Sequence, residues 1–258
     1  MTSSAAPKAS ITLSLIGIGC GDPDQLTLAA IYAINAADLI LIPRKGDEKS
    51  ELADLRRSIC RDMLTSDKTR IAEFDLPVRD TNEADYRKGV DEWHDAVAAA
   101  WSSEIKHHLG HEGRVALLIW GDPSLYDSSL RIARRLDPSA AIEVVPGVTS
   151  IQALCAAHAL PLNEIGEAFL ITTGRRLRED GWPAGVNTVV VMLDGGTAFQ
   201  SLDPARLHIW WGAYLGMESE ILMSGALAEI GPRIATARRE ARERHGWIMD
   251  SYILKRST

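Results

Sequence analysis

The sequence lacks several features that would assign it to a class at once. No apolar run reaches the ~18 residues that a membrane-spanning helix needs, and residues 1–10 have no apolar centre of the kind that a signal peptide carries. The three cysteines, Cys20, Cys60 and Cys155, show no metal-type spacing and are typical of reduced thiols. These absences argue against a disulfide scaffold, a zinc site and a membrane partner, and we expect a cytoplasmic protein.

Basic residues are also in the minority. The chain has 28 Lys and Arg against 35 Asp and Glu, a formal net charge of −7, and no long basic tract. This balance argues against nucleic acid as the main partner and favours a small molecule. With 258 residues and 46% hydrophobic content, the chain can bury the core of one large α/β domain or of two small ones.

Glycines, by contrast, gather where a strand is expected to end. Gly17, Gly19 and Gly21 follow the apolar segment 11–16 at alternate positions, and Asp22-Pro23 then reads as the start of a helix. Because glycine has no Cβ, such a loop lets the main chain approach a ligand. A second Gly-Asp-Pro follows the apolar segment 115–120, so we expect one site built from both strand ends.

The first glycine loop is superficially similar to a dinucleotide-binding fingerprint. That fingerprint needs Gly-x-Gly-x-x-Gly and an acidic residue at the end of the next strand. Here the third glycine comes one position early, and Asp22 brings negative charge to the place of a pyrophosphate. The next strand has Asp38 at its start instead of its end. The loop therefore argues against a nicotinamide dinucleotide.

Hydrophobic periodicity predicts two α/β halves. In the first half, strands predicted at 11–17, 37–42, 70–74, 114–120 and 141–145 alternate with helices, including 50–63, 83–108 and 149–160, which favours a mainly parallel sheet covered on both sides. After Pro161 the predicted elements are strands 168–173, 187–193, 207–214, 220–223 and 247–254 with a helix at 226–245, which favours a mixed sheet. We place the boundary near 158–166 and expect domains at 11–160 and 161–258.

Three segments, in this order and spacing, resemble the signatures of the tetrapyrrole (precorrin/corrin) methyltransferase family. They are Gly17-Ile-Gly-Cys-Gly-Asp-Pro23, Trp120-Gly-Asp-Pro-Ser-Leu-Tyr126 and Val144-Val-Pro-Gly-Val-Thr-Ser150. The resemblance implies a class III methyltransferase fold: two α/β domains, a mainly parallel N-terminal sheet, a mixed C-terminal sheet, and S-adenosylmethionine in the cleft between them. It also implies a homodimer. Residues 41–52 and 55–60 resemble the branch that methylates carbon 1 of the tetrapyrrole precorrin-5 and releases acetate.

The resemblance also implies cofactor contacts, which suit a sulfonium with a flat adenine because they offer bare main chain and apolar walls. The second-domain contacts are less well matched, since many members have Met-Gly at Leu193-Asp-Gly195 and Asn-Gly-Thr at Tyr214-Leu-Gly216. The implied contacts are Cys20, Gly21, Pro23, Gly121, Asp122, Leu125, Thr149, Ser150, Ile151, Met192, Leu193, Leu215 and Ala228.

The candidates for catalytic and substrate-binding residues are chosen from what the chemistry of the reaction requires. Release of acetate needs a polar group that orients water, for which Tyr126, Asp22 and Asp127 lie on suitable loops. Asp22 and Asp122 fit turn or helix caps equally well. The His107-His108 pair with His111 is expected to end a helix, and we expect no metal site. The basic candidates for the carboxylates of a precorrin are Arg44, Lys45, Arg175, Arg176 and Arg178.

Three alternatives stay open at this point. The chain could methylate another carbon of the macrocycle, could be a nucleotide-dependent oxidoreductase, or could carry a tetrapyrrole without turning it over. Only a methyltransferase should prefer S-adenosylmethionine or its demethylated product over NAD(P) in a binding titration.

Overall fold

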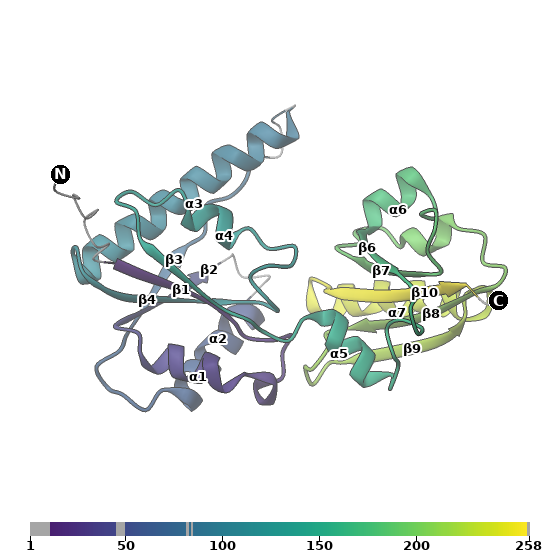
Figure 1. Ribbon diagram of the computed structural model, residues 1–258, viewed down its shortest axis with the longest axis horizontal. Coiled ribbons are helices and arrows are strands. Elements are labelled where there is room, and N and C mark those ends of the chain that lie inside the picture. Colours follow the sequence, from purple (N-terminus) through teal and green to yellow (C-terminus); the bar gives the residue numbers. More distant parts are fainter. Residues whose placement is uncertain (1–10, 45–49, 81–82, 84, 257–258) are drawn as a thin grey trace. The chain divides into compact units, whose positions relative to one another are not determined.

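The computed structural model describes residues 11–44, 50–80, 83 and 85–256 (Figure 1). The chain divides into two compact units. The first contains residues 11–19 and 23–148, and the second contains residues 20–22 and 149–256.

The sheet of the first unit is entirely parallel, as the sequence predicts. Its strand order is β3-β2-β4-β1-β5, and every adjacent pair runs in the same direction. The strands are β1 (Ile11–Gly17), β2 (Leu39–Arg44), β3 (Arg70–Asp75), β4 (Gly113–Ile119) and β5 (Ala141–Val145).

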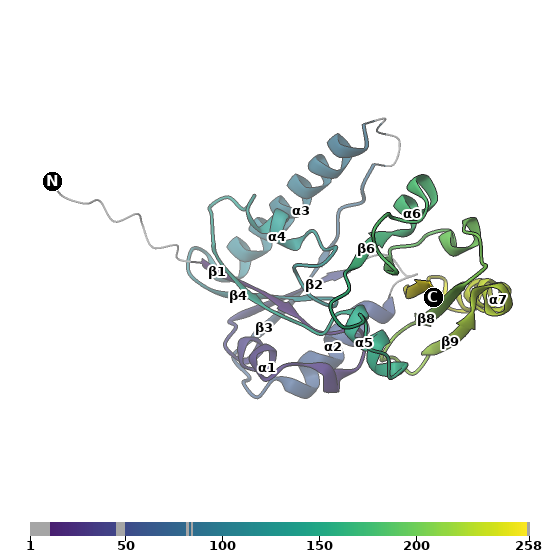
Figure 2. The same cartoon turned by 45° about the vertical axis from the view of Figure 1, so that its right-hand side comes forward.

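Helices cover both faces of this sheet because successive strand residues point to opposite sides. In β1, Leu13 and Leu15 belong to one buried cluster, whereas Ile16 and Ile18 belong to another. The first cluster packs under α3 (Tyr86–Leu109) and α4 (Ser129–Ala133), and the second under α1 (Leu28–Asn35) and α2 (Ser50–Met63). Figures 1 and 2 show these two pairs of helices on opposite faces.

Local signals set the ends of the helices. The Thr27 hydroxyl accepts a hydrogen bond from the N–H of Ala30 at 3.0 Å and caps α1. Asp85 caps α3 in the same way, and Gly110, with φ +73°, ends it. Within α3 the predicted apolar period is confirmed at Val97 and Trp101, which are buried.

The sheet of the second unit is mixed, again as predicted. Its order is β6-β7-β10-β8-β9. Strands β6 and β7 are parallel, whereas β10 is antiparallel to β7 and β8, and β8 is antiparallel to β9. The strands are β6 (Phe169–Thr173), β7 (Thr188–Met192), β8 (Leu207–Ala213), β9 (Ile221–Ala226) and β10 (Asp250–Arg256).

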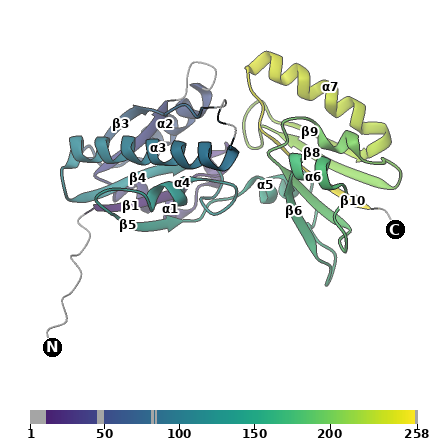
Figure 3. The same cartoon turned by 90° about the horizontal axis from the view of Figure 1, so that it is seen from above.

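The helices of the second unit explain why the observed division differs from the predicted boundary. Helix α7 (Leu227–His245) packs on β8 and β9, and α6 (Gly174–Asp180) packs on β6, β7 and η3 (Ala198–Ser201) (Figure 3). Helix α5 (Ser150–Ala157) contacts β8 and β10, and the division therefore falls at 148/149 instead of near 158–166. Within the described residues, no helix is long and apolar enough to span a membrane.

Candidate functional site

Three glycines bring the carboxyl ends of β1, β4 and β5 together. A Cβ on Gly17 would lie 2.5 Å from the Gly147 nitrogen, and a Cβ on Gly147 would lie 2.1 Å from the Gly121 carbonyl oxygen. Both distances are shorter than real Cβ contacts, so no larger residue fits at Gly17 or Gly147 without moving the loops. The loops after β1, β4 and β5 therefore lie against one another at these glycines, while the single site built from both Gly-Asp-Pro loops stays a prediction.

A short antiparallel bridge joins the two loops. The N–H of Gly121 donates to the carbonyl of Gly19 at 2.8 Å. Gly121 has φ +66°, and a Cβ there would meet nothing within 4 Å. The side of Gly121 on which a side chain would stand is therefore free of neighbours, as the predicted cofactor contact requires, although the residue itself is buried.

Asp122 is engaged within the protein. Its carboxylate accepts hydrogen bonds from the N–H of Gly147 at 2.9 Å, from the N–H of Ser124 at 2.8 Å, and from the Ser124 hydroxyl. Burial alone would raise the pKa of Asp122, but these hydrogen bonds hold the pKa below its usual value. The side chain thus ties the loop after β4 to the loop after β5, in line with the turn-cap interpretation.

Leu125 and Tyr126 lie further along the same loop. Leu125 is partly buried, and its N–H donates to the carbonyl of Asp122 at 3.2 Å. Tyr126 is 44% exposed and has φ +50°, a left-handed conformation that is costly for a bulky residue. Partial burial raises the pKa of its hydroxyl, so Tyr126 can donate a proton or a hydrogen bond at neutral pH.

In the second unit, residues 20–22 pack against the segment after β8. A Cβ on Gly21 would lie 2.4 Å from Met217 Cγ and 3.1 Å from the Leu215 carbonyl oxygen. The structure therefore brings together the predicted cofactor residues Gly21 and Leu215. Cys20 is buried, and burial raises the pKa of its thiol to about 12, which agrees with a packing role and not with a nucleophile.

The end of β7 presents a strained, exposed apolar side chain. Leu193 follows Met192, has φ +51°, and is 64% exposed. Both features are unfavourable for leucine in a folded chain, and strained exposed residues of this kind concentrate at ligand sites. The observation agrees with the predicted cofactor contact at Leu193.

The next residue, Asp194, organises this end of the sheet and was missed from the sequence. Its buried carboxylate accepts hydrogen bonds from the N–H of Gly196, from the Tyr252 hydroxyl at 2.7 Å, and from Arg178 at 2.7 Å. Burial would raise the pKa of Asp194, but these donors hold it below its usual value. An Asp followed by two glycines directly after a buried strand was the signal that could have revealed it.

A second buried acid, Asp250, supports this arrangement from β10. It accepts hydrogen bonds from Trp211 Nε1 at 2.9 Å and from Arg238 Nε at 2.9 Å. Arg238 also donates to the Asp194 carbonyl, so the two acids are linked. Burial raises the pKa of Asp250 despite Arg238, and the network makes this end of the second sheet a rigid platform.

The start of α5 holds three further predicted residues. The Thr149 hydroxyl accepts from the N–H of Ile151 at 3.2 Å and caps the helix. Ser150 shares a 3.0 Å hydrogen bond with Ser251 of β10, and Ile151 is buried. The side chains of Thr149 and Ser150 therefore have structural partners, and their main chain is what remains for a ligand.

Ala228 does not join the other predicted contacts. Because β9 runs antiparallel to β8, Ala226 lies opposite His208 at the start of β8, and α7 begins at that edge. Leu193 and Leu215 follow the carboxyl ends of β7 and β8, at the other edge of the sheet. We therefore remove Ala228 from the candidate site.

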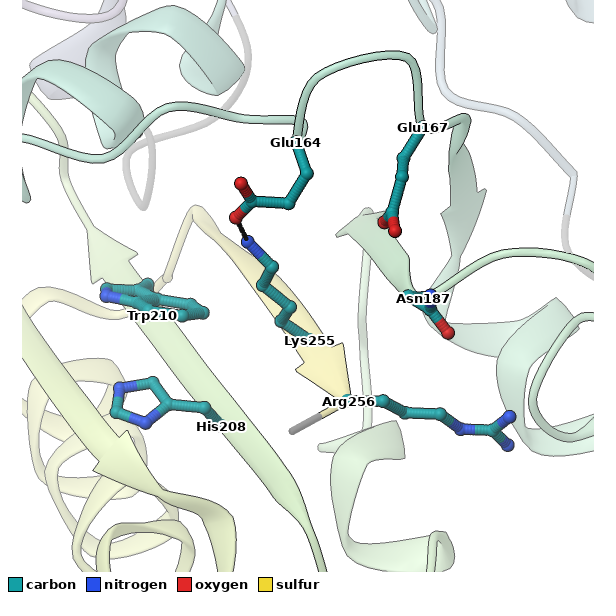
Figure 4. Close-up of a pocket in the computed structure, with 7 residues that line it drawn as sticks. All are labelled: Glu164, Glu167, Asn187, His208, Trp210, Lys255 and Arg256. Carbon is teal, nitrogen blue, oxygen red and sulfur yellow. Dashed lines mark hydrogen bonds and ion pairs between the residues drawn. The ribbon is translucent and has the colours of Figure 1, made fainter. Parts of the chain in front are cut away.

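A separate pocket of about 330 Å³ lies at the same edge as Ala228 (Figure 4). Its Lys255 forms an ion pair with Glu164, and the rings of His208 and Trp210 lie 4.1 Å apart between centroids. Burial lowers the pKa of His208. None of the residues predicted from sequence lines this pocket, so it is distinct from the candidate site.

The basic residues proposed to bind substrate carboxylates differ in the ion pairs that they already form. Arg178 forms an ion pair with the buried carboxylate of Asp194 at 2.7 Å. Arg44 pairs with Asp75 at 3.0 Å and Arg176 with Asp180 at 3.2 Å, all on exposed side chains, where such pairs are weak. Arg175 lies beside Arg176 on α6, and Lys45 lies outside the described residues.

The comparison with known families decides among the alternatives. Residues 12–231 match the family described as Tetrapyrrole (Corrin/Porphyrin) Methylases. The chain belongs to the tetrapyrrole methylases. Membership in a methylase family removes the oxidoreductase and the passive carrier as explanations.

Individual relatives of this tetrapyrrole methylase agree with the match. The chain is 47% identical over 246 residues, 94% of each chain, to a protein named precorrin-6A synthase [deacetylating] from Sinorhizobium sp. It is 26% identical over 62% of its length to a precorrin-2 C(20)-methyltransferase from the same source.

Solved structures agree as well. A cobalamin synthesis related protein (CobF) from Corynebacterium diphtheriae superposes with a TM-score of 0.82 at 40% identity, covering 96% of this chain and 99% of that one. A uroporphyrin-III C-methyltransferase from Thermus thermophilus, solved with S-adenosylhomocysteine, shares the fold at 22% identity with a TM-score of 0.55, covering 94% and 96% of the two chains.

Proposed function

We propose that the chain is an S-adenosylmethionine-dependent methyltransferase of cobalamin biosynthesis, which methylates carbon 1 of precorrin-5 and releases acetate to give precorrin-6A. The observation that carries this proposal is the 47% identity, over 94% of both chains, to the Sinorhizobium protein named precorrin-6A synthase [deacetylating]. A relative named precorrin-2 C(20)-methyltransferase matches 62% of the chain at 26% identity, which makes a different macrocycle carbon the second candidate.

The residues present fit the cofactor. The Cβ position of Gly121 faces open space. Tyr126 presents an exposed ring and Leu193 an exposed apolar side chain, and both residues have a left-handed backbone conformation. When bound, S-adenosylmethionine supplies an electrophilic methyl group. The remaining requirement on the protein is to hold its main chain in a fixed shape and to align the accepting carbon.

We propose separate contributions from the two units. In the first unit, Gly121 and Leu125 present main chain and an apolar wall, while Asp122 fixes their loop through Gly147. In the second unit, Cys20, Gly21, Met192, Leu193 and Leu215 play the same part, braced by Asp194. Pro23 and the main chain of Thr149, Ser150 and Ile151 complete the set.

Acetate release adds a second requirement, because water must attack the acetyl group. We propose Tyr126 as the group that orients this water, since its hydroxyl is protonated, accessible and on the loop after β4. Asp22 is a second candidate on the first loop. Arg44, Lys45, Arg175 and Arg176 are proposed to meet carboxylates of the substrate.

We further propose a homodimer in the cytoplasm, as the family resemblance implies. Light scattering on the purified chain would give the mass of the assembly directly. A mass of one chain at micromolar concentration would refute the dimer.

The experiment that tests the reaction is incubation with S-adenosylmethionine and individual precorrins. We expect one methyl transfer to precorrin-5 and none to precorrin-2, identified by the mass and the carbon-13 spectrum of the product. Transfer to precorrin-2 instead would support the second candidate, and no transfer to any precorrin would refute both. S-adenosylhomocysteine should inhibit the reaction competitively, whereas NAD should have no effect.

A further inference from the structure

Arg56 of α2 is held in an unusual way for a charged side chain. Its Nε donates to the Leu118 carbonyl of β4 at 2.9 Å, and its Nη1 donates to the Leu52 carbonyl at 3.0 Å. Among the described side chains, which are those of residues 11–44, 52–80, 83 and 85–256, no carboxylate lies within ion-pair distance of its guanidinium. By contrast, the neighbouring Arg57 is paired with Glu73 and Asp54.

The position of Arg56 follows from the way two strands separate. Strands β2 and β4 are paired only from Leu39 opposite Val115 to Leu41 opposite Leu117, whereas β2 stays paired with β3 as far as Arg44. The carbonyl of Ile119 accepts from Ile18 on the β1 side. Because alternate carbonyls of a strand point to opposite sides, the Leu118 carbonyl points toward β2, which no longer pairs there, and Arg56 satisfies it.

This position is one where parallel sheets bind ligands. After β2 the chain continues to α2 on one face of the sheet, and after β4 it continues to α4 on the other face. Ligands of parallel sheets bind at the carboxyl ends of strands whose connections diverge in this way. Between β1 and β4 the same edge is closed by the bridge from Gly19 to Gly121, so the edge between β2 and β4 is the open one.

The guanidinium has hydrogen-bonding capacity left for an anion. Arginine has five N–H donors, and only two hydrogen bonds to the described residues are formed here. The side chain is partly accessible, yet burial lowers the pKa of Arg56 to about 10, and only the field of Asp127 opposes this. Asp127 itself accepts from the N–H of Ser129 at 2.6 Å and forms no ion pair with Arg56.

We propose that Arg56 binds a carboxylate of the tetrapyrrole substrate, through the guanidinium donors that its two backbone carbonyls leave unused. The inference rests on the proposed function for the identity of the substrate. A planar guanidinium binds a carboxylate with two parallel hydrogen bonds, and the two carbonyls fix the orientation of that fork in advance.

The test compares Arg56→Gln and Arg56→Lys with the matched control Arg57→Gln on the next position of the same helix. We expect Arg56→Gln to raise the KM for precorrin-5 by about ten- to a hundredfold, as for a lost charge-assisted hydrogen bond, with kcat within about twofold. Arg56→Lys keeps the charge without the fork and should lie in between. Affinity for S-adenosylhomocysteine should stay unchanged in all three variants.

A second measurement does not depend on turnover. Uroporphyrin III, a stable tetrapyrrole with carboxylates, can be titrated by fluorescence, and its Kd should rise in Arg56→Gln and not in Arg57→Gln. If the wild type fails to methylate precorrin-5, the proposed function is wrong, while the uroporphyrin titration still tests Arg56.

Two results would overturn the inference. One is a KM and a Kd in Arg56→Gln equal to those in Arg57→Gln. The other is an equal loss of S-adenosylhomocysteine affinity and thermal stability in both Arg56 variants, which would assign Arg56 to the joint between α2 and β4. If Arg56→Gln fails to fold, Arg56→Lys decides between these outcomes by its KM and Tm.

Discussion

Two buried polar residues of the first unit contrast in how their hydrogen-bonding groups are satisfied. Both oxygens of Asp122 accept hydrogen bonds from the loops that they join. His94 on α3 is equally enclosed, at 3% exposure, but neither of its ring nitrogens has a hydrogen-bond partner. Asp122 should therefore stabilise the native loops, whereas His94 should make the native state sensitive to acid.

Replacing Asp122 tests whether it acts through the loops. Asp122→Ala leaves the N–H groups of Gly147 and Ser124 without their acceptor, so the free energy of unfolding should fall by about 1–3 kcal/mol. The free energy of unfolding should fall less in Asp122→Asn, because one acceptor oxygen remains. Urea unfolding and titration with S-adenosylhomocysteine should then show stability and affinity falling together. Lost affinity with wild-type stability would instead assign the carboxylate to the ligand.

Replacing His94 tests the acid sensitivity. Burial, followed by the charge of Arg135, lowers the pKa of His94 below its ordinary 6.5. The unfolded chain therefore binds a proton that the folded chain refuses, and stability is lost as the pH falls below about 6.5, by up to about 1.4 kcal/mol per pH unit. His94→Leu should remove this part of the pH dependence.

The control for His94 lies on the same helix. His107→Leu changes an exposed histidine of α3 and should leave the pH dependence as in the wild type. Urea unfolding between pH 7 and pH 5 gives the comparison. Parallel curves for wild type and His94→Leu would contradict the prediction.

At the scale of secondary-structure elements, the glycines of the first sheet make two separable contributions. Gly147 is required for packing, because its Cβ would lie 2.1 Å from the Gly121 carbonyl oxygen. Gly121 is buried, but a Cβ built on it would meet nothing within 4 Å, and its backbone has φ +66°. The first should affect the fold of the strand ends and the second the surface offered to a ligand.

An alanine at each glycine separates these roles. Gly147→Ala should lower the free energy of unfolding by about 3 kcal/mol or more, because the ends of β1, β4 and β5 must move apart. Gly121→Ala should cost only about 1–2 kcal/mol of backbone strain. The added methyl group enters the open space. The Gly121→Ala variant should therefore lose more free energy of S-adenosylhomocysteine binding than free energy of unfolding. Equal stability losses would contradict the packing argument.

The elements themselves could largely be predicted from the sequence, because their signals are local. The helix at 50–63 and the strand at 141–145 are predicted at their observed ends, and the mixed character of the second sheet follows from its hairpins. The assignment of α5 could not be predicted, because the contacts of its residues with β8 and β10 are long-range. The edge of the sheet at which Ala228 lies could not be predicted for the same reason, because no local pattern shows in which direction β9 runs.

At the scale of the whole molecule, the chain order and the spatial division do not coincide. Residues 20–22 belong with the second unit although the strand before them lies in the first, because Gly21 packs on Leu215 and Met217. The sequence predicted the glycine loop as a ligand surface, but not this partner. Asp194 likewise accepts hydrogen bonds from Tyr252 and Arg238, which are distant in sequence, and these bonds could not be predicted. The family motifs therefore predicted the site region better than the residues that stiffen it.

The reaction of the whole enzyme makes a prediction about coupling. Attack of water on the acetyl group breaks the bond that joins this group to the macrocycle. The electron pair of that bond stays on the conjugated macrocycle and is the pair with which carbon 1 takes the methyl group. Methyl transfer and acetate release should therefore occur in equal amounts, and acetate formed in oxygen-18 water should contain one labelled oxygen. Mass spectrometry of the acetate and of the tetrapyrrole checks both. Tyr126→Phe should slow the two products equally, with S-adenosylhomocysteine affinity unchanged. A methylated product that retains its acetyl group would refute the deacetylating assignment and leave the methyltransferase assignment intact.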